Sequence, residues 1–260
     1  MSRGIKKMTA TIFSLQGKSA IVAGGLGKFG WEASVALSNA GARVYIFGRS
    51  PAVDPVIEQA LDDMNIIYVC CDCSDPEVIS SALEKIQCVP SIFVNATSAR
   101  QVVGLASSSM DLWEKAVIRN SRILYATNTV LGELMSKVVG GSIINYSSIY
   151  AVNGVDNRIY EGTSMATEPD YPFIKGGVLA FTRYMASQYG PMNVRFNSIV
   201  AGGMEGDQPS SFKERYSRKV PLGRMMSPGD IGGPIVFLAS EASSYVTGSA
   251  LYVDGGFSSW

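Results

Sequence analysis

Residues 19–41 read SAIVAGGLGKFGWEASVALSNAG: a short apolar run, a glycine-rich turn, and a segment whose apolar side chains repeat at helical spacing from Phe29 to Ala40. Three glycines in the turn fit the pattern G-x-G-x-x-G: Gly25, Gly27 and Gly30. Glycine allows a tight turn and a close approach of backbone to a diphosphate, and the start of the following helix offers free N–H groups. The context therefore predicts a nucleotide-binding turn, with a purely structural turn as the alternative.

The alternation of apolar runs and helix-length segments continues to the end of the chain. Strands are expected at 19–24, 43–48, 66–71, 91–95, 141–148, 194–200 and 249–254. Helices are expected at 28–41, 51–64, after an Asp75-Pro76 cap, and around 109–138, 173–189 and 228–240. Apolar strands separated by helices indicate a parallel sheet covered on both faces.

We therefore predict an α/β fold: a Rossmann-like doubly wound parallel sheet of about seven strands with helices on both faces. The chain shows no linker, repeat or low-complexity block. A single domain is expected at 18–260, after a flexible N-terminal leader at 1–17.

Composition excludes several kinds of protein. Hydrophobic residues make up 47% of the 260 residues and charged residues 17%, which supplies a core and argues against disorder. Lys plus Arg and Asp plus Glu both number 22, so the chain lacks the basic excess of a nucleic-acid binder. Because there is no histidine, acid–base chemistry must use Tyr, Lys, Cys, Asp or Glu.

The cysteines bear on metals and on compartment. They are Cys70, Cys71, Cys73 and Cys88. Their spacing suits neither a disulfide framework nor a paired zinc site, so we interpret them as small packing residues and expect no metal. Free thiols fit a reducing compartment. The N-terminus is too short and polar for a signal peptide and no stretch is long enough to span a membrane, so we expect a cytoplasmic protein without a membrane partner.

The end of the second expected strand indicates which dinucleotide the turn would bind. An acidic residue there would hydrogen-bond the ribose 2′-hydroxyl of NAD. This strand ends in IFGRS, with Gly48 at that position and Arg49 after it. The Arg49 guanidinium can pair with a 2′-phosphate, and Lys28 adds a second cation. NADP(H) is therefore favoured over NAD(H), although Arg49 as a solvated loop charge is the alternative.

Several further motifs follow in order: CDCSD (71–75), VNAT (94–97), Asn120 in a long helix, INYSS (144–148), YPFIK (171–175), VRFNSIVAGG (194–203) and PLGRMM…VDGG (221–256). Together with the glycine loop they resemble the single-domain branch of the short-chain dehydrogenase/reductase superfamily, from Ser19 to Phe257. The resemblance implies the catalytic residues Asn120, Ser148, Tyr171 and Lys175. It implies these coenzyme-binding residues: Gly24, Leu26, Gly27, Lys28, Phe29, Gly30, Arg49, Asp72, Cys73, Asn95, Ala96, Thr97, Tyr171, Lys175, Gly202, Gly203 and Met204.

The implied chemistry agrees with the residue types. Tyr171 and Lys175 are four apart and so share one helix face. An ammonium beside a phenol favours the phenolate, so Tyr171 can give a proton to a nascent alkoxide or take one from an alcohol. In the family pattern Ser148 holds the substrate oxygen, although Ser147 lies beside it. Asn120 would anchor a water that relays protons to Lys175, with a structural amide as the alternative.

The sequence departs from the family pattern at four places. Lys28 stands where the loop has a glycine, with Ala23 in place of its threonine; Thr97 replaces the glycine of Asn-Ala-Gly; and Ala201 replaces a proline. The fourth departure is the spacing of 23 positions between Ser148 and Tyr171, longer than is usual in the family. The extra residues are expected to form an irregular loop over the substrate pocket, or else a surface insertion without substrate contact.

The motifs of this insertion look like those of a subgroup associated with bacterial surface-sugar and flagellin-glycan biosynthesis. We therefore expect a carbonyl/alcohol oxidoreductase for a small sugar-like substrate, with Arg158, Tyr160, Glu161 and Thr163 as candidate hydrogen-bonding residues. The alternatives are a 3-ketoacyl-thioester reductase and a catalytically silent nucleotide-binding protein. The resemblance also implies a homo-oligomer, a dimer or tetramer, formed through the helices around 109–138 and 173–189.

Overall fold

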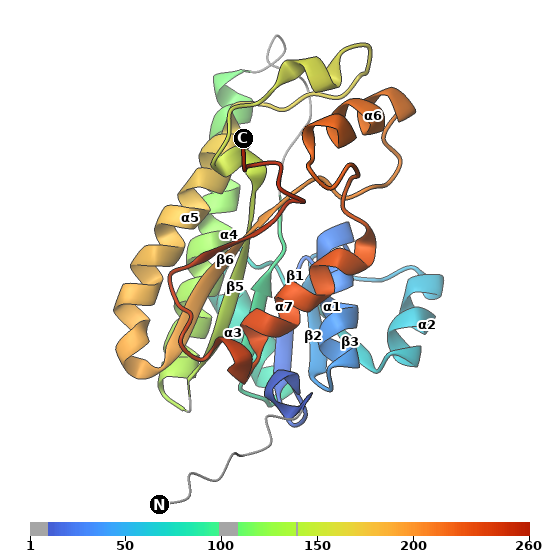
Figure 1. Cartoon of the computed structure of the whole chain (residues 1–260). Helices are drawn as coiled ribbons and strands as arrows, with labels where there is room; N and C mark the ends of the chain where they lie inside the picture. Colours follow the sequence, from blue (N-terminus) through green and yellow to red (C-terminus); the bar gives the residue numbers. More distant parts are fainter. Residues whose placement is uncertain (1–9, 99–108, 139) are drawn as a thin grey trace, which may run out of the picture.

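The computed structural model describes residues 10–98, 109–138 and 140–260. Its centre is a seven-stranded parallel sheet in the order β3-β2-β1-β4-β5-β6-β7 (Figure 1). The strands are β1 (Ser19–Ala23), β2 (Arg43–Gly48), β3 (Ile66–Cys70), β4 (Ile92–Asn95), β5 (Gly141–Ser148), β6 (Val194–Ala201) and β7 (Ala250–Val253). The predicted α/β doubly wound sheet is confirmed.

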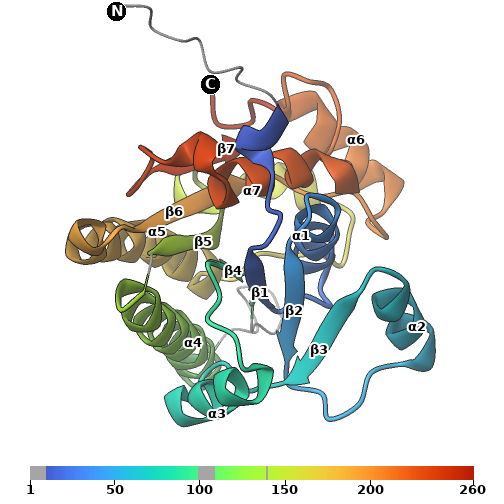
Figure 2. The same ribbon diagram turned by 90° about the horizontal axis from the view of Figure 1, so that it is seen from below.

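Helices cover both faces of the sheet (Figure 2). They are α1 (Lys28–Asn39), α2 (Pro55–Asp63), α3 (Pro76–Ile86), α4 (Met110–Ser136), α5 (Asp170–Tyr189), α6 (Ser210–Lys219) and α7 (Gly232–Ala239). One face carries α1 and α7, with α2 at the β3 edge; the other carries α3, α4 and α5. No helix in the described part of the chain is both long enough and apolar enough to cross a membrane.

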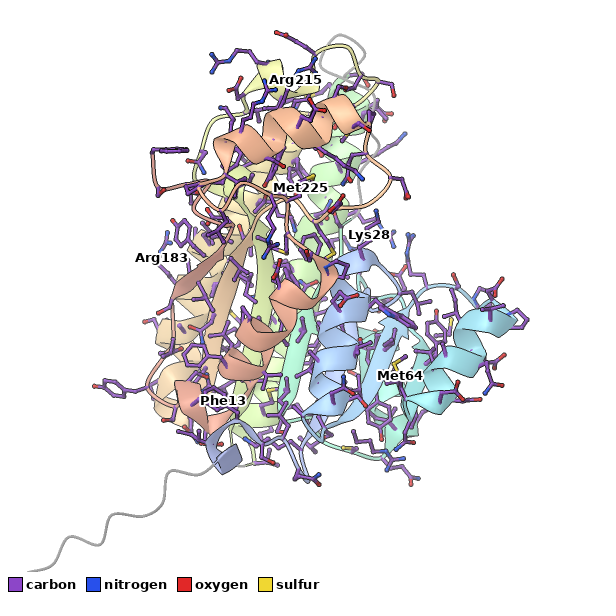
Figure 3. The ribbon with its side chains drawn as sticks, turned by 45° about the vertical axis from the view of Figure 1, so that its right-hand side comes forward. Phe13, Lys28, Met64, Arg183, Arg215 and Met225 are labelled. Atoms are coloured by element: carbon purple, nitrogen blue, oxygen red, sulfur yellow. The ribbon has the colours of Figure 1, made fainter. Side chains whose placement is uncertain are left out.

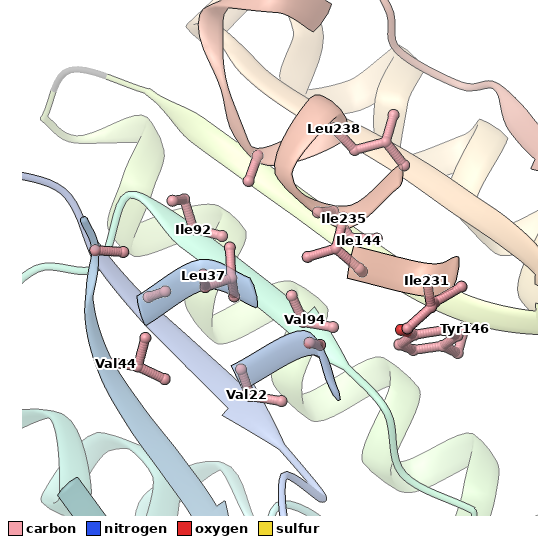
Figure 4. Packing of buried hydrophobic residues seen from close by; sticks show 14 of the residues in the cluster. Val22, Leu37, Val44, Ile92, Val94, Ile144, Tyr146, Ile231, Ile235 and Leu238 are labelled. Carbon is pink, nitrogen blue, oxygen red and sulfur yellow. The ribbon is translucent and has the colours of Figure 1, made fainter. Parts of the chain in front are cut away.

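The core consists of apolar side chains from both faces of the strands. On the first face Val22, Val94 and Ile144 pack against Leu37 of α1 and Ile235 of α7 (Figure 4). β1 and β4 are buried along nearly their whole length, which explains why their sequences show no polar alternation.

Three boundaries differ from the sequence-based expectation by more than two residues. The prediction of a flexible leader at 1–17 was wrong for its last part. Ala10–Phe13 form the short 3-10 helix η1, and Leu15 is fully buried because its side chain packs in the core with residues of α1. Residues 1–9 lie outside the described part of the chain. Helix α2 begins at Pro55 rather than at 51, because the Asp54 side chain accepts a hydrogen bond from the Val56 N–H and caps it there.

Helix α5 begins at Asp170 rather than at 173, so Tyr171 lies in its first turn. Helix α6 was not expected at all, and the segment expected to be helical over 228–240 is divided into the turn η6 (Pro228–Ile231) and α7. Pro172 fits the first turn of α5, where a missing N–H costs no hydrogen bond.

The order of the strands locates the place for a ligand. Chain connections run outward in opposite directions from β1 and β4, which lie side by side at the centre. In sheets of this kind ligands bind beyond the carboxyl ends of the strands at such a reversal.

Candidate active site

Two cavities lie beyond the carboxyl ends of the strands and share part of their walls. The first, of about 380 Å³, is lined by Gly24, Gly27, Lys28, Phe29, Phe47, Gly48, Arg49, Cys71, Asp72, Cys73, Ala96, Thr97, Ser98, Arg119 and Ile123. The second, of about 340 Å³, shares Lys28, Phe29 and Ala96–Ser98 with it and continues towards Ser148 and Tyr171. The two cavities thus form one groove across the sheet.

The glycine loop makes a close-packed turn at the centre of this groove. Gly24 has φ +74°, a backbone conformation that favours glycine, and a Cβ there would lie 3.0 Å from the Ala96 carbonyl oxygen. A Cβ on Gly30 would lie 2.3 Å from the Gly24 carbonyl oxygen. Lys28 is accommodated as the first residue of α1, so the helix start remains intact despite the lost glycine.

The positions of Lys28 and Arg49 separate two cations that sequence reasoning had grouped together. Arg49 is exposed, lines the first cavity and follows β2. The Lys28 ammonium instead lies 3.7 Å from the Asp207 carboxylate, in the segment after β6. Lys28 and Arg49 thus both line the first cavity, but the Lys28 ammonium is paired with the segment after β6.

Gly48 lies against the side chain of Tyr68, on the neighbouring strand β3. A Cβ there would lie 2.7 Å from the Tyr68 hydroxyl oxygen, which donates a hydrogen bond to the Ser50 carbonyl at 2.8 Å. The Tyr68 ring therefore occupies the space that an acidic side chain at position 48 would need.

Asp72 and Arg119 form an ion pair at the far end of the first cavity. Arg119 donates to both carboxylate oxygens at 3.2 and 3.3 Å, and the Ser74 N–H and hydroxyl also donate to the carboxylate. Partial burial raises the pKa of Asp72, but the bonds from Ser74 and Arg119 outweigh it, and the net shift is downward. Sequence reasoning missed Arg119, because only the fold brings α4 to the end of β3.

The cysteines divide by position. Cys71 and Cys73 are buried, line the first cavity and hydrogen-bond to each other. This hydrogen bond, together with burial, raises the pKa of the Cys73 thiol. Cys70 is exposed, so the interpretation of all four as packing residues was wrong for Cys70; Cys88 is half-buried.

The second cavity brings together three of the four expected catalytic side chains. Ser148 ends β5, and its hydroxyl accepts the Tyr150 N–H at 3.2 Å, which leaves its proton for another acceptor. The neighbouring Ser147 hydroxyl instead donates to the Lys175 backbone carbonyl at 2.8 Å. Both serines line the second cavity, but the Ser147 proton is already donated to the Lys175 carbonyl.

Tyr171 and Lys175 lie on one side of α5, with the Lys175 ammonium 5.8 Å from the centre of the Tyr171 ring. Lys175 is only 7% exposed and donates a hydrogen bond to the Tyr146 carbonyl at 2.9 Å. The Tyr150 ring meets Tyr171 edge-on at 6.4 Å.

Asn120 lies in α4, one residue after Arg119. Its side chain donates to the Ala116 carbonyl at 2.8 Å, and it is not part of either cavity wall. This hydrogen bond is the kind expected of a structural amide, so the water-anchoring role remains a proposal.

The segments after β4 and β6 hold several of the remaining expected coenzyme residues by hydrogen bonds within the protein. Asn95 accepts hydrogen bonds from the Thr97 N–H and hydroxyl, at 3.2 and 2.7 Å, which turns Thr97 back towards the end of β4. Gly203 donates its N–H to the Tyr216 hydroxyl at 2.5 Å. Gly202, Gly203 and Met204 all line the second cavity, whereas Leu26 lines neither cavity.

The insertion contributes one wall of the second cavity, through Tyr160, Met165, Ala166 and Thr167. The Tyr160 hydroxyl lies 2.6 Å from the Tyr150 hydroxyl and 2.9 Å from the Thr167 hydroxyl. Three of the four side chains expected to bind substrate do not line this cavity. Arg158 pairs with Asp156, Thr163 donates to the Tyr160 carbonyl, and the Glu161 backbone carbonyl accepts from Arg215.

Sequence reasoning also missed several lining residues: Tyr150, Gln208, Phe212, Tyr216 and Met225. Among the charged residues of the two walls, Asp72 is outnumbered by four cations: Lys28, Arg49, Lys175 and Arg119. A groove with this excess of positive charge, with Gly24 and Gly27 in its wall, fits a phosphate-bearing dinucleotide.

The comparisons with known proteins agree with this geometry. The family model described as Enoyl-(Acyl carrier protein) reductase matches residues 28–258. A 3-oxoacyl-[acyl-carrier-protein] reductase of Chlamydia trachomatis is 28% identical, over 93% of this chain and 98% of its own length. An L-rhamnose 1-dehydrogenase (NAD(P)(+)) of Azotobacter vinelandii is 31% identical, over 92% and 96%.

Solved structures show the same arrangement of strands and helices. The crystal structure of a short chain dehydrogenase from Leptospira borgpetersenii with bound NAD+ superposes with a TM-score of 0.82 at 30% identity and covers 93% of each chain.

Proposed function

The chain belongs to the short-chain dehydrogenase/reductase family, and on that premise we propose that this NAD(P)-dependent oxidoreductase interconverts a carbonyl and a secondary alcohol on a small, sugar-like substrate. The observation that carries the proposal is the meeting of Ser148, Tyr171 and Lys175 in a cavity that opens into the groove. The nicotinamide coenzyme supplies or accepts the hydride.

The side chains of this cavity orient the substrate and transfer the proton. The Ser148 hydroxyl donates a hydrogen bond to the carbonyl oxygen and orients it. As negative charge develops on that oxygen, the Tyr171 hydroxyl gives it a proton, and the buried Lys175 ammonium stabilises the phenolate that remains. In the oxidative direction Tyr171 takes the alcohol proton instead.

We favour NADP(H) over NAD(H) as the coenzyme. Tyr68 leaves no room for an acidic side chain at position 48, and Arg49 is exposed on the wall beside it. A 2′-phosphate would therefore meet a guanidinium and no carboxylate from position 48. Titration with NADPH and NADH, followed by nicotinamide fluorescence, tests this preference; tighter binding of NADH would overturn it.

The proposal of a sugar-like substrate is based on the cavity wall that the insertion forms. Three hydroxyls, of Tyr150, Tyr160 and Thr167, form a hydrogen-bonded row there. Such a row can exchange hydrogen bonds with substrate hydroxyls, and the neighbouring aromatic rings can cover a sugar's apolar face. A role in surface-sugar biosynthesis remains part of this proposal.

The second candidate is reduction of a 3-ketoacyl thioester, which the similarity to the reductase of Chlamydia trachomatis favours. The two are separated by following NADPH oxidation with a panel of keto-sugars and with acetoacetyl coenzyme A. Turnover of keto-sugars alone supports our proposal, and turnover of the thioester alone supports the second candidate. A catalytically silent nucleotide-binding protein would bind NADPH and turn over neither.

We further propose a cytoplasmic homo-oligomer, a dimer or tetramer, formed through α4 and α5. Tyr125 of α4 and Phe173 and Tyr184 of α5 are each about 60% exposed, which is a large apolar surface to leave in water. Light scattering of the purified protein gives its mass directly, and a monomer would refute this proposal.

A further inference from the structure

Lys28 occupies the junction of the two cavities. It is the first residue of α1, at the end of the helix where the diphosphate of a dinucleotide binds in folds of this class. Its side chain lines both cavities, and it is half-exposed. Figure 3 shows it at the end of α1 that faces the α6 segment.

The Lys28 side chain reaches across the groove to the segment between β6 and α6. Its ammonium lies 3.7 Å from the Asp207 carboxylate, and a Cβ on Gly206 would lie only 1.9 Å from it. Position 206 therefore provides the space in which the ammonium sits. Gln208, two residues on, lines the second cavity.

We propose that Lys28 is a clasp that binds the coenzyme diphosphate and joins the two walls of the groove over it. This inference rests on the proposed function, because it requires a dinucleotide in the groove. The diphosphate is common to NADH and NADPH. The clasp therefore contributes equally to the binding of both, whereas Arg49 acts only on the 2′-phosphate.

The ammonium gains a stronger partner in the diphosphate than it has in Asp207. The Asp207 side chain is fully exposed, and ion pairs between exposed groups contribute little. A diphosphate that enters the groove offers the ammonium two negative charges in a less solvated place, which strengthens the attraction. The ammonium thus stays in the space at Gly206 and takes the diphosphate as its main partner when the dinucleotide binds.

Lys28→Met tests the clasp, with Lys213→Met as the matched control. Lys213 of α6 pairs at 3.1 Å with Glu205, which lies in the same segment as Asp207. Lys213 lines neither cavity. We expect Lys28→Met to raise the Kd of NADPH and of NADH by about tenfold each, the effect of losing one charge-assisted hydrogen bond. Lys213→Met should leave both unchanged, and Arg49→Leu should weaken NADPH alone.

Gly206→Ala provides a second test that keeps the charge. The only close contact of the added methyl group is with the flexible end of Lys28, so the ammonium is displaced while the fold is preserved. We expect Gly206→Ala to raise the Kd of NADPH and the Kd of NADH by equal factors, as Lys28→Met does. Gly229→Ala, where an added Cβ meets nothing within 4 Å, is the control.

Two results would overturn the clasp: a loss confined to NADPH in Lys28→Met, or affinities equal to those of Lys213→Met. If the wild-type protein itself binds neither coenzyme, it is the proposed function that fails. Thermal unfolding of each variant verifies that it is folded.

Discussion

Gly27 and Gly30 look equivalent in the glycine motif, but replacing Gly30 by alanine should be much more damaging than replacing Gly27. At position 30 the added Cβ would lie 2.3 Å from the Gly24 carbonyl oxygen and 2.7 Å from the Gly25 Cα, both backbone atoms that cannot swing aside. An ordinary contact needs about 1 Å more, so the start of α1 must move away from the loop by roughly that distance. Overpacking of this kind costs about 1–3 kcal/mol of the free energy of unfolding.

The same shift should weaken coenzyme binding. A displacement of about 1 Å spoils hydrogen bonds from the first turn of α1 to the diphosphate, so we expect at least about a tenfold higher Kd for NADPH. Gly27→Ala is the control: its Cβ would lie 3.4 Å from the Gly24 oxygen, and its φ of −81° suits alanine. That variant should lose no more than about 1 kcal/mol.

Urea denaturation followed by tryptophan fluorescence gives the two stabilities, and fluorescence titration gives the two affinities. Equal losses for Gly27→Ala and Gly30→Ala would show that the close contacts of position 30 with Gly24 and Gly25 do not set the cost of the added methyl group. Normal NADPH binding by Gly30→Ala would refute the placement of the diphosphate.

Three further predictions concern the side chains around the groove. Ser148→Ala should lower kcat by about a hundredfold or more, because it removes a hydrogen-bond donor to the reacting oxygen. Ser147→Ala should instead cost about 1 kcal/mol of the free energy of unfolding and much less activity. Steady-state kinetics with the best substrate of the panel distinguishes the two variants, and a larger loss of kcat in Ser147→Ala would contradict the assignment. Burial raises the pKa of Tyr216 to about 12, so the unfolded chain loses this proton at lower pH than the folded one, and the free energy of unfolding should fall as pH rises from about 10 to 12. Urea titrations should show a smaller fall in Tyr216→Phe, and an identical fall would argue against this cause. Iodoacetamide should modify the exposed Cys70 first and Cys73 last, because burial and the bond to Cys71 disfavour the Cys73 thiolate; peptide mass spectrometry that found Cys73 labelled first would contradict this order.

The sequence predicts the layered architecture well, since each feature it uses is local. Apolar runs such as that of β1 and the glycine turn before α1 are continuous in the chain, and the four-residue spacing of Tyr171 and Lys175 fixes their common helix face.

What the sequence could not predict depends on contacts between distant segments. Arg119 meets Asp72 only because the fold brings this part of α4 beside the segment after β3, and Tyr216 reaches Gly203 from a helix whose polar sequence gave no apolar periodicity. Lys28 was grouped with Arg49 because both are cations near the glycine loop, yet its side chain turns towards β6. In each case the direction of the side chain is a tertiary property.

Tyr171→Phe tests whether Tyr171 carries the proton in a nicotinamide-dependent reaction. NADPH binding and NADPH oxidation with the substrate panel should be measured together on this variant and on the wild type. We predict that binding stays unchanged while turnover falls by at least about a hundredfold. Turnover that survives the substitution would show that Tyr171 is not the proton donor.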